Sequence, residues 1–242
     1  MKIPRSGYLV FEDNYFLAVD KPAGVLSVPS EKRGNPKQDG QSSLFNVLDL
    51  PEDSLFPVHR LDRDTSGVLL LAKSKEALEK MQNIFRERRI KKIYKALVLG
   101  ITPKKGRINS PIKRRERSRT KFRVSNAVGA REALTEFETR ETFRLEFGSF
   151  SLLQVRIFTG RTHQIRVHLS SIGFPVLLDF DYGRRQENEV FSRRTNLSRQ
   201  FLHASNLEFE HPFSKEKIEI TAKLSQDLSS ALRLLRKPKI KT

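Results

Sequence analysis

The chain has 242 residues, of which 37% are hydrophobic and 31% are charged. This length is enough for one large domain or two small ones with a buried core. The formal net charge of +18 at pH 7 favours a polyanionic partner, such as RNA, DNA or an anionic membrane surface. The absence of cysteine excludes disulfides, thiolate catalysis and cysteine-ligated metal sites.

No segment of the sequence has the pattern of a secretion signal or a membrane span. Residues 1–10 lack an apolar core followed by a small-residue cleavage site. The strongest apolar run, Val68–Ala72, is too short to cross a bilayer. We therefore expect a cytoplasmic protein with a nucleic-acid partner and no membrane partner, and a monomer as the default state.

The first hundred residues are predicted to alternate strands and helices. β-branched, aromatic or uniformly apolar runs predict strands at Tyr15–Val19, Val68–Ala72 and Ile93–Leu99. Ser43 and Ser74 are each predicted to cap a helix, because apolar residues recur at helical spacing after them. The polar segment Ser30–Ser42, with two glycines and a proline, predicts a mobile loop.

The most basic stretch of the chain covers about residues 102–123. Its basic side chains are opposed only by Glu116, and aliphatic Ile108 and Ile112 interrupt it. A disordered tail seldom contains such apolar anchors, so we predict a strand-and-loop segment that contacts phosphates. The residues expected to make these contacts are Lys113, Arg114 and Arg115.

The C-terminal half is predicted to contain paired strands at Ala133–Thr139 and Leu152–Ile157. A second basic loop is predicted at about residues 184–199. An apolar stripe then predicts a core-packed helix, formed by Leu224, Leu228, Ala231, Leu232 and Leu235. The tail, Lys237–Thr242, is predicted to fray.

Strands outnumber helices, and both occur without an internal repeat, a linker or a break in composition. We therefore predict a single α+β domain over residues 1–242. Its centre is expected to be a mixed, mainly antiparallel sheet flanked by helices and loops. The order of the strands cannot be derived from the pattern alone.

Two polar segments differ from ordinary packing sequence. Pro57–Gly67 places Asp62 between arginines, immediately before the predicted buried strand. A nearby guanidinium favours the ionised carboxylate, which can then attack an electrophilic carbon. A structural salt bridge explains the same residues and, from the residues alone, is the more common arrangement. The second segment, Phe158–His168, follows a predicted strand and contains Gly160, which permits an unusual backbone angle.

The five histidines do not show a metal-binding pattern. His163 and His168 are five residues apart, which suits neither a helical pair of ligands nor one face of a strand. The sequence also lacks a glycine-rich phosphate loop and a dinucleotide-binding fingerprint. We therefore predict no metal and no cofactor.

The run His59–Gly67 closely resembles the signature of the RluA-type pseudouridine synthases. Other motifs of that family have similar segments here, at Asp20–Gly24, Lys92–Val98, Gly106–Val124, Thr159–His168, Leu202–Ala204 and His211–Pro212. The chain departs from the family at Leu178, where a glycine usually precedes the aspartate. It is also expected to lack the N-terminal S4 domain that many relatives carry.

The resemblance implies the pseudouridine synthase fold and an isomerase that flips a specific uridine of rRNA or tRNA, presented in a stem-loop, and makes it pseudouridine. Asp62 matches the catalytic aspartate, Tyr94 the tyrosine under the target base, and Arg166 the arginine that pairs with the aspartate. Arg60 matches the residue that replaces the uridine in the RNA stack, and Ile165 lies at the apolar pocket position. Further RNA contacts are expected at Arg63, Arg161, His163 and Gln164.

Two other functions fit part of the pattern. An RNA chaperone on the same fold would need the basic segments, but not the set of Asp62, Tyr94 and Arg166. A metal-assisted RNA hydrolase is disfavoured by the histidine spacing. An isomerase needs neither redox change nor an outside group, which agrees with the missing cofactor motifs.

Overall fold

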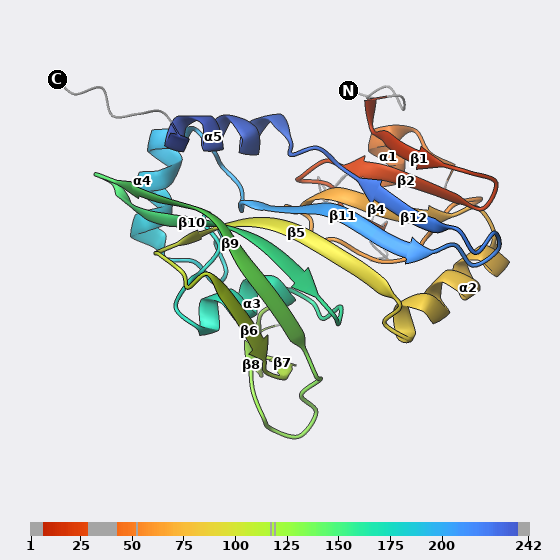
Figure 1. The fold of residues 1–242 in the computed structure, drawn as a ribbon, viewed down its shortest axis with the longest axis horizontal. Coiled ribbons are helices and arrows are strands. Elements are labelled where there is room, and N and C mark those ends of the chain that lie inside the picture. Colours follow the sequence, from red (N-terminus) through yellow and green to blue (C-terminus); the bar gives the residue numbers. More distant parts are fainter. Residues whose placement is uncertain (1–6, 29–42, 52, 117, 119, 237–242) are drawn as a thin grey trace. The chain divides into compact units, whose positions relative to one another are not determined.

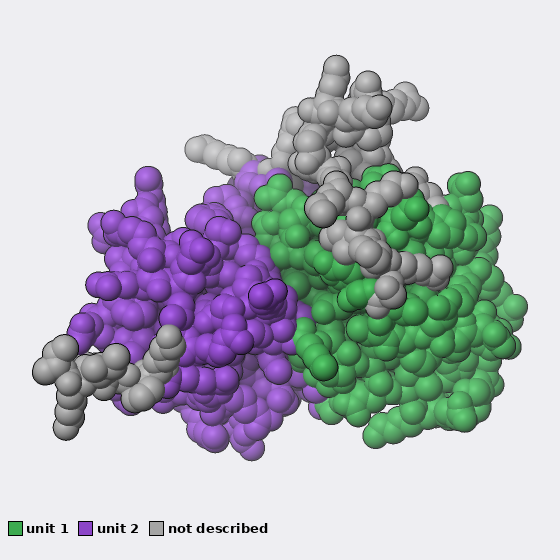
Figure 2. Space-filling model, turned by 90° about the horizontal axis from the view of Figure 1, so that it is seen from above, with its two compact units in different colours: residues 1–92, 204–223 green, residues 93–203, 224–242 purple. Residues whose placement is uncertain are grey.

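The computed structural model describes residues 7–28, 43–51, 53–116, 118 and 120–236. The predicted mobile loop at residues 30–42 and the predicted frayed tail at 237–242 lie outside these residues. The chain forms two compact units, residues 1–92 with 204–223 and residues 93–203 with 224–242 (Figure 2). Strands β5 (Ile90–Leu99) and β11 (Leu202–Glu210) each contain residues of both units.

The first unit is built on a sheet (Figure 1). Besides β11, its strands are β1 (Leu9–Glu12), β2 (Phe16–Lys21), β3 (Phe56–Pro57), β4 (Ser66–Ala72) and β12 (Lys217–Thr221). In this sheet β1 pairs with β2, β2 with β4, β3 with β4, and β11 with β12, each antiparallel. Strand β4 lies between β2 and β11, and all its residues are buried. The predicted buried strand is thereby confirmed.

The two helices of this unit, α1 (Leu44–Leu48) and α2 (Lys75–Arg86), begin at the predicted serine caps. The hydroxyl of Ser43 accepts the amide of Asn46 at 3.3 Å, and that of Ser74 accepts the amide of Ala77 at 3.1 Å. Each cap satisfies a backbone donor that the first helical turn leaves unpaired. Helix α2 then packs its apolar face on the core that includes β4.

The second unit has a sheet in which β10 (Gly148–Ile157) lies between β5 and β9 (Leu134–Leu145), with β6 (Lys105–Asn109) beyond β9. Strands β9 and β10 are antiparallel neighbours, as predicted. The basic segment contains β6 and a separate two-stranded hairpin, β7 (Ile112–Arg114) with β8 (Phe122–Val124). The strand-and-loop prediction for this segment is confirmed.

Three helices complete the second unit: α3 (Gln164–Ser171), α4 (Arg185–Thr195) and α5 (Gln226–Arg236). Helix α4 occupies most of the segment predicted as a second basic loop, so that prediction was wrong. Phe191 anchors α4 in the core. The predicted C-terminal stripe is confirmed, because Leu228, Ala231, Leu232 and Leu235 of α5 are buried.

The predicted α+β class with a mainly antiparallel sheet is confirmed. Within the described ranges, no helix is long and apolar enough to span a membrane. The single-domain organisation over residues 1–242 stays a prediction.

Candidate active site and RNA interface

Asp62 opens a tight turn that leads into β4. The amide of Thr65 donates to the carbonyl of Asp62 at 3.1 Å, which closes the turn. Leu61 and Thr65 on either side are buried, whereas Asp62 itself is half-buried. The carboxylate is therefore attached to a backbone segment that the core of the first unit anchors.

The backbone on both sides of Asp62 is bound by a second segment of the same unit. The hydroxyl of Ser27 donates to the carbonyl of Leu61 at 2.9 Å and accepts the amide of Leu61 at 3.0 Å. The amide of Gly24 donates to the carbonyl of Arg63 at 2.9 Å. These contacts fix the two residues that flank the aspartate.

Lys21 adds a buried ammonium group to this arrangement. Its Nζ donates to the carbonyls of Pro22, Val25 and Arg63 at 2.8, 2.7 and 3.0 Å. Because Lys21 is fully buried, its charge is tolerated only with such acceptors in place. Lys21 therefore holds the carbonyl of Arg63, the residue that follows Asp62.

His59 and Gly67 of the same motif have structural roles. His59 Nε2 accepts the amide of Leu70 at 3.1 Å. Burial, with the nearby charge of Lys92, lowers the pKa of His59 to about 3, so the ring is neutral at pH 7. Gly67 has a φ of 114°, and a Cβ there would lie 2.1 Å from the carbonyl oxygen of Ala204. Both residues are therefore needed for the path of the chain into β4.

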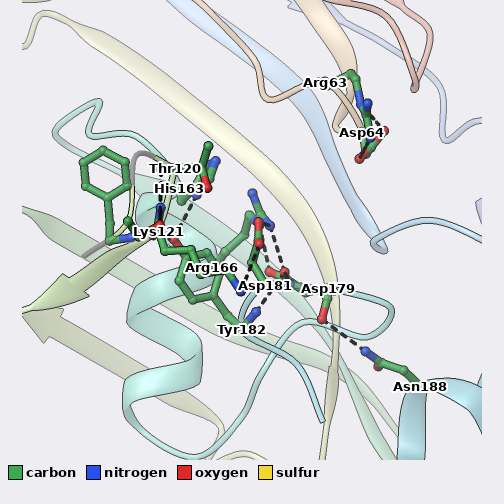
Figure 3. A network of polar contacts seen from close by, with 12 residues as sticks. Arg63, Asp64, Thr120, Lys121, His163, Arg166, Asp179, Asp181, Tyr182 and Asn188 are labelled. Atoms are coloured by element: carbon green, nitrogen blue, oxygen red, sulfur yellow. Dashed lines mark hydrogen bonds and ion pairs between the residues drawn. The ribbon is translucent and has the colours of Figure 1, made fainter. Parts of the chain in front are cut away.

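Arg166 is buried in the first turn of α3 and is held by two carboxylates (Figure 3). Its Nε and Nη2 donate to the two oxygens of Asp179 at 2.7 and 2.8 Å, and Nη2 also donates to Asp181 at 3.0 Å. The guanidinium lies 5.1 Å from the ring centre of Tyr182. Bidentate pairing of this kind fixes both the position and the plane of a guanidinium.

Asp181 links Arg166 to the basic hairpin. Lys121 Nζ, in the loop between β7 and β8, lies 3.4 Å from the carboxylate of Asp181. Burial alone would raise the pKa of Asp181, but the hydrogen bond and charge of Arg166, with the charge of Lys121, lower it below its ordinary value. Asp181 is therefore ionised at neutral pH and bridges two cations (Figure 3).

Tyr182 makes a second connection between the hairpin and α3. Its hydroxyl accepts the amide of Phe122 at 2.8 Å and lies 2.9 Å from Nδ1 of His163. Burial raises the pKa of Tyr182, so the hydroxyl keeps its proton at neutral pH. The hydroxyl therefore joins β8 to His163, and the tautomer of His163 sets which of the two groups donates.

Leu178, the position that departs from the family pattern, keeps a backbone conformation that favours glycine. Its φ is 60°, and its side chain is buried. The amide of Leu178 donates to Asn188 Oδ1 at 2.8 Å, and Asn188 Nδ2 donates to the carbonyl of Asp179 at 3.1 Å. A left-handed leucine costs about 1–2 kcal/mol, and burial of its side chain contributes roughly 1.5–3 kcal/mol. The leucine is therefore compatible with the turn that places Asp179.

The other residues singled out in the sequence differ in exposure. Tyr94 and Ile165 are buried, whereas Lys113 and Arg161 are partly buried. The exposed ones are Arg60, Arg63, Arg114 and Arg115. Arg63 pairs with Asp64 at 3.2 Å, an exposed pair that contributes little to stability. Exposed arginines remain suited to contacts with phosphates and bases.

Gln164 has a structural role in this arrangement. Its side chain is buried, and its oxygen accepts the hydroxyl of Thr159 and the amide of Arg161 at 2.6 and 3.1 Å. Its amide nitrogen donates to the carbonyl of Leu134 and the hydroxyl of Thr135, both at 3.0 Å. These bonds fill the capacity of the amide group. We therefore assign Gln164 to the loop before α3, rather than to the RNA interface.

Sequence reasoning gave no role to Lys21, Ser27, Lys121 or Asp181. One visible signal in the sequence was the presence of two acids two residues apart, Asp179 and Asp181, in a strongly basic chain. A lysine at the end of an apolar strand was another. Neither signal identifies the distant partners, because Arg63 lies 42 residues from Lys21, and Arg166 lies 13 and 15 residues from the two acids.

The described part of the chain contains no group of three histidine, aspartate or glutamate side chains placed to hold a metal ion. The nitrogens of His168 lie 2.9 Å from the hydroxyl of Thr135 and 2.8 Å from the carbonyl of Ser110, and burial lowers the pKa of His168. That histidine is therefore a neutral core residue. The absence of a metal and a cofactor stays a prediction.

Residues 15–171 match the family model described as RNA pseudouridylate synthase. The chain is 36% identical over 236 residues to ribosomal large subunit pseudouridine synthase C of Buchnera aphidicola, covering 97% of this chain and 72% of the relative. It is 35% identical over 240 residues to ribosomal large subunit pseudouridine synthase D of Pseudomonas aeruginosa, with 94% and 69% covered. An uncharacterized RNA pseudouridine synthase of Chloroflexus aurantiacus is 42% identical over 224 residues, and the chain spans 65% of its length.

Solved structures agree with these sequence matches. Human RNA Pseudouridylate Synthase Domain Containing 1 has a TM-score of 0.72 at 28% identity, with 93% of this chain and 86% of that chain covered. Fold and sequence together define the class: an RNA-modifying isomerase. The chain belongs to the RNA pseudouridylate synthase family and, within it, to the RluA type.

Proposed function

We propose that this chain converts a uridine in the RNA of the large ribosomal subunit into pseudouridine, with Asp62 as the nucleophile. The relatives from Buchnera and Pseudomonas are named for the large ribosomal subunit, which supports this substrate. The segment that matches the family contains Asp62, Tyr94 and Arg166. The observation that carries the proposal is the rigid turn at Asp62, bound on both sides by Lys21, Gly24 and Ser27.

The chemistry needs only groups that the chain supplies. The bond between the ribose and N1 of uracil breaks, the base rotates, and a new bond forms at carbon 5. Carbon 5 loses a proton and N1 gains one, so the product is an isomer of uridine. A carboxylate that is already oriented loses little conformational freedom when it attacks. The contacts of Lys21 and Ser27 with Arg63 and Leu61 support this role, because they fix the backbone that carries the carboxylate.

The uridine must leave its stack before it can react, which costs a few kcal/mol. We assign Arg60, whose side chain is exposed, to the gap that the uridine leaves. Tyr94 is assigned to stack under the flipped base, a contact worth roughly 1–3 kcal/mol. Arg166 is assigned to keep Asp62 ionised, with its own orientation set by Asp179 and Asp181.

The test replaces Asp62 with asparagine, which keeps the shape of the side chain and removes the charge. Purified Asp62→Asn should form no pseudouridine in large-subunit RNA and should bind that RNA as the wild type does. The matched control is Asp64→Asn, which removes an exposed carboxylate paired with Arg63. That variant should stay active. An active Asp62→Asn enzyme would refute the role of Asp62.

The same chemistry is then mapped in cells. Pseudouridines in total RNA are compared between cells with and without this protein, and we expect one or more sites to disappear from large-subunit RNA. Loss of sites from transfer RNA alone would overturn the proposed substrate and keep the proposed reaction. RNA cleavage that requires an added metal would favour the hydrolase, and RNA binding without either reaction would favour the chaperone.

A further inference from the structure

Phe180 is the most exposed phenylalanine or tyrosine in the described part of the chain, with 76% of its surface accessible. Tyr15, the next most exposed, reaches 37%. A single exposed apolar residue is common on protein surfaces, so exposure alone does not indicate a function. The position of Phe180 between two residues that bind Arg166 is what indicates a function.

Phe180 stands between the two carboxylates that hold Arg166. The oxygens of Asp179 lie 2.7 and 2.8 Å from the guanidinium nitrogens of Arg166, and an oxygen of Asp181 lies 3.0 Å away. The ring is therefore attached one peptide unit from each partner of the arginine that we assign to catalysis. A side chain in this place is directed to solvent beside the two carboxylates that hold Arg166.

The backbone that carries Phe180 is fixed by hydrogen bonds. The amides of Asp181 and Tyr182 donate to Asp179 Oδ1 at 2.9 and 3.2 Å, and the amide of Gly183 donates to the carbonyl of Asp179 at 2.9 Å. A Cβ at Gly183 would lie 2.3 Å from that carbonyl oxygen, so the turn is closely packed. The exposed ring is thus carried by a preorganised turn, which limits the entropy lost when a ligand stacks on it.

The charge around Phe180 is compatible with RNA. Arg166 pairs with both neighbouring carboxylates, and Lys121 of the basic hairpin lies 3.4 Å from Asp181. Arg184 and Arg185 follow shortly in sequence and are exposed, and each forms a surface ion pair, with Glu187 at 3.7 Å and with Glu189 at 2.9 Å. On a chain with a net charge of +18, an exposed aromatic ring is a suitable surface for an unpaired base, whose face stacks on the ring while cations elsewhere contact the RNA backbone.

We propose that Phe180 stacks on an unpaired base of the substrate RNA. This inference rests on the proposed function and extends it, because it adds a residue that selects how the RNA is presented. The ligand is a nucleobase with an accessible face. A protein partner that buries the ring is the alternative, and the test separates the two.

The first experiment compares Phe180→Ala, Phe180→Leu and Phe180→Trp in RNA affinity and in KM and kcat. Stacking is worth about 1–3 kcal/mol, so Ala and Leu should each raise Kd and KM by roughly 5- to 150-fold, while Trp stays near wild type. The control is Leu234→Ala, which removes an exposed apolar side chain of α5 and should change nothing. Full RNA binding by the Leu or Ala variant would overturn the inference.

The second experiment places an abasic nucleotide at each position around the target uridine and measures the Kd of each RNA. At one position the abasic nucleotide should raise the Kd of the wild type relative to the intact RNA. The same change should leave the Kd of Phe180→Ala unaltered. Equal losses for both proteins at every position would overturn the inference. Since this readout is binding, it is independent of turnover. An inactive wild type would refute the proposed function, whereas an active wild type with unchanged Phe180 variants would refute only the stacking role.

Discussion

In the motif His59–Gly67, some residues are proposed to react with the RNA and others support the fold. His59 supports the fold. A histidine followed by an arginine in an RNA-modifying protein is easily assigned to phosphate contact. In the structure it accepts the amide of Leu70, and burial with Lys92 nearby keeps it neutral. The signature histidine therefore supports β4, and Asp62, the carboxylate that we propose as the nucleophile, lies three residues further along.

We predict a pH dependence of stability that belongs to this histidine. The unfolded chain protonates His59 near its ordinary pKa of 6.5, whereas the folded chain resists protonation until about pH 3. Between pH 6.5 and pH 3 the unfolded chain binds a proton at His59 that the folded chain does not bind. The free energy of unfolding therefore falls as the pH falls from 6.5 toward 3, and above pH 6.5 His59 has little effect on it. From pH 7 to pH 5 the loss is about 2 kcal/mol.

His59→Gln provides the comparison, because glutamine can accept the amide of Leu70 and does not titrate. Urea unfolding of both proteins at pH 7 and pH 5 gives the free energy of unfolding at each pH. The wild type should lose more of it than the variant between these values. Parallel losses would show that His59 does not resist protonation in the folded state.

Among the elements, those with a simple apolar pattern were predictable and those held by polar contacts were not. Strand β4 and helix α2 follow from an apolar run and a capped, periodic helix. Helix α4 has mostly polar and charged residues around its anchor Phe191, so its sequence looked like a loop. Helix α3 begins after His163, which has a left-handed φ of 56°. A glycine at this position would have indicated such a turn in the sequence, and a histidine does not.

The candidate site could be predicted only in part, for a related reason. Asp62, Tyr94 and Arg166 were selected because motifs carry them. The partners of Arg166 lie 13 and 15 residues away, on a loop that turns through Leu178 in a left-handed conformation. Local propensity does not encode such a turn at a leucine, since long-range packing stabilises it.

The hairpin β7–β8 is the element for which we predict a role in RNA affinity. Replacement of Lys113, Arg114 and Arg115 with glutamine should weaken RNA binding and reduce its dependence on salt. Each lost phosphate contact should lower the slope of log K against log salt by about 0.7–0.9. Binding measured between 50 and 200 mM salt (about the range in which such slopes are resolved) gives this value.

The matched control for the hairpin removes three exposed lysines elsewhere, Lys215, Lys217 and Lys223. It changes the net charge by the same amount. If nonspecific charge dominates, both triple variants weaken binding equally. Only a larger effect at the hairpin supports a specific interface there.

At the scale of the molecule, the two compact units are not separate lengths of chain. The first unit contains residues 1–92 and 204–223, so the chain leaves it and returns. Strands β5 and β11 each carry residues of both units. Local unfolding that begins in one unit would therefore include part of β5 or β11, whose other residues belong to the other unit. We expect one cooperative domain over residues 1–242 for this reason.

We predict that the chain unfolds in a single transition. Leu70→Ala in the first unit and Phe150→Ala in the second each remove a fully buried side chain and should each destabilise by about 2–5 kcal/mol. In calorimetry both variants should lower the midpoint of one peak, with the calorimetric enthalpy equal to the van't Hoff enthalpy. Two resolved peaks, with each variant shifting a different one, would show instead that the units unfold independently. Continuous strands would then be insufficient to couple them.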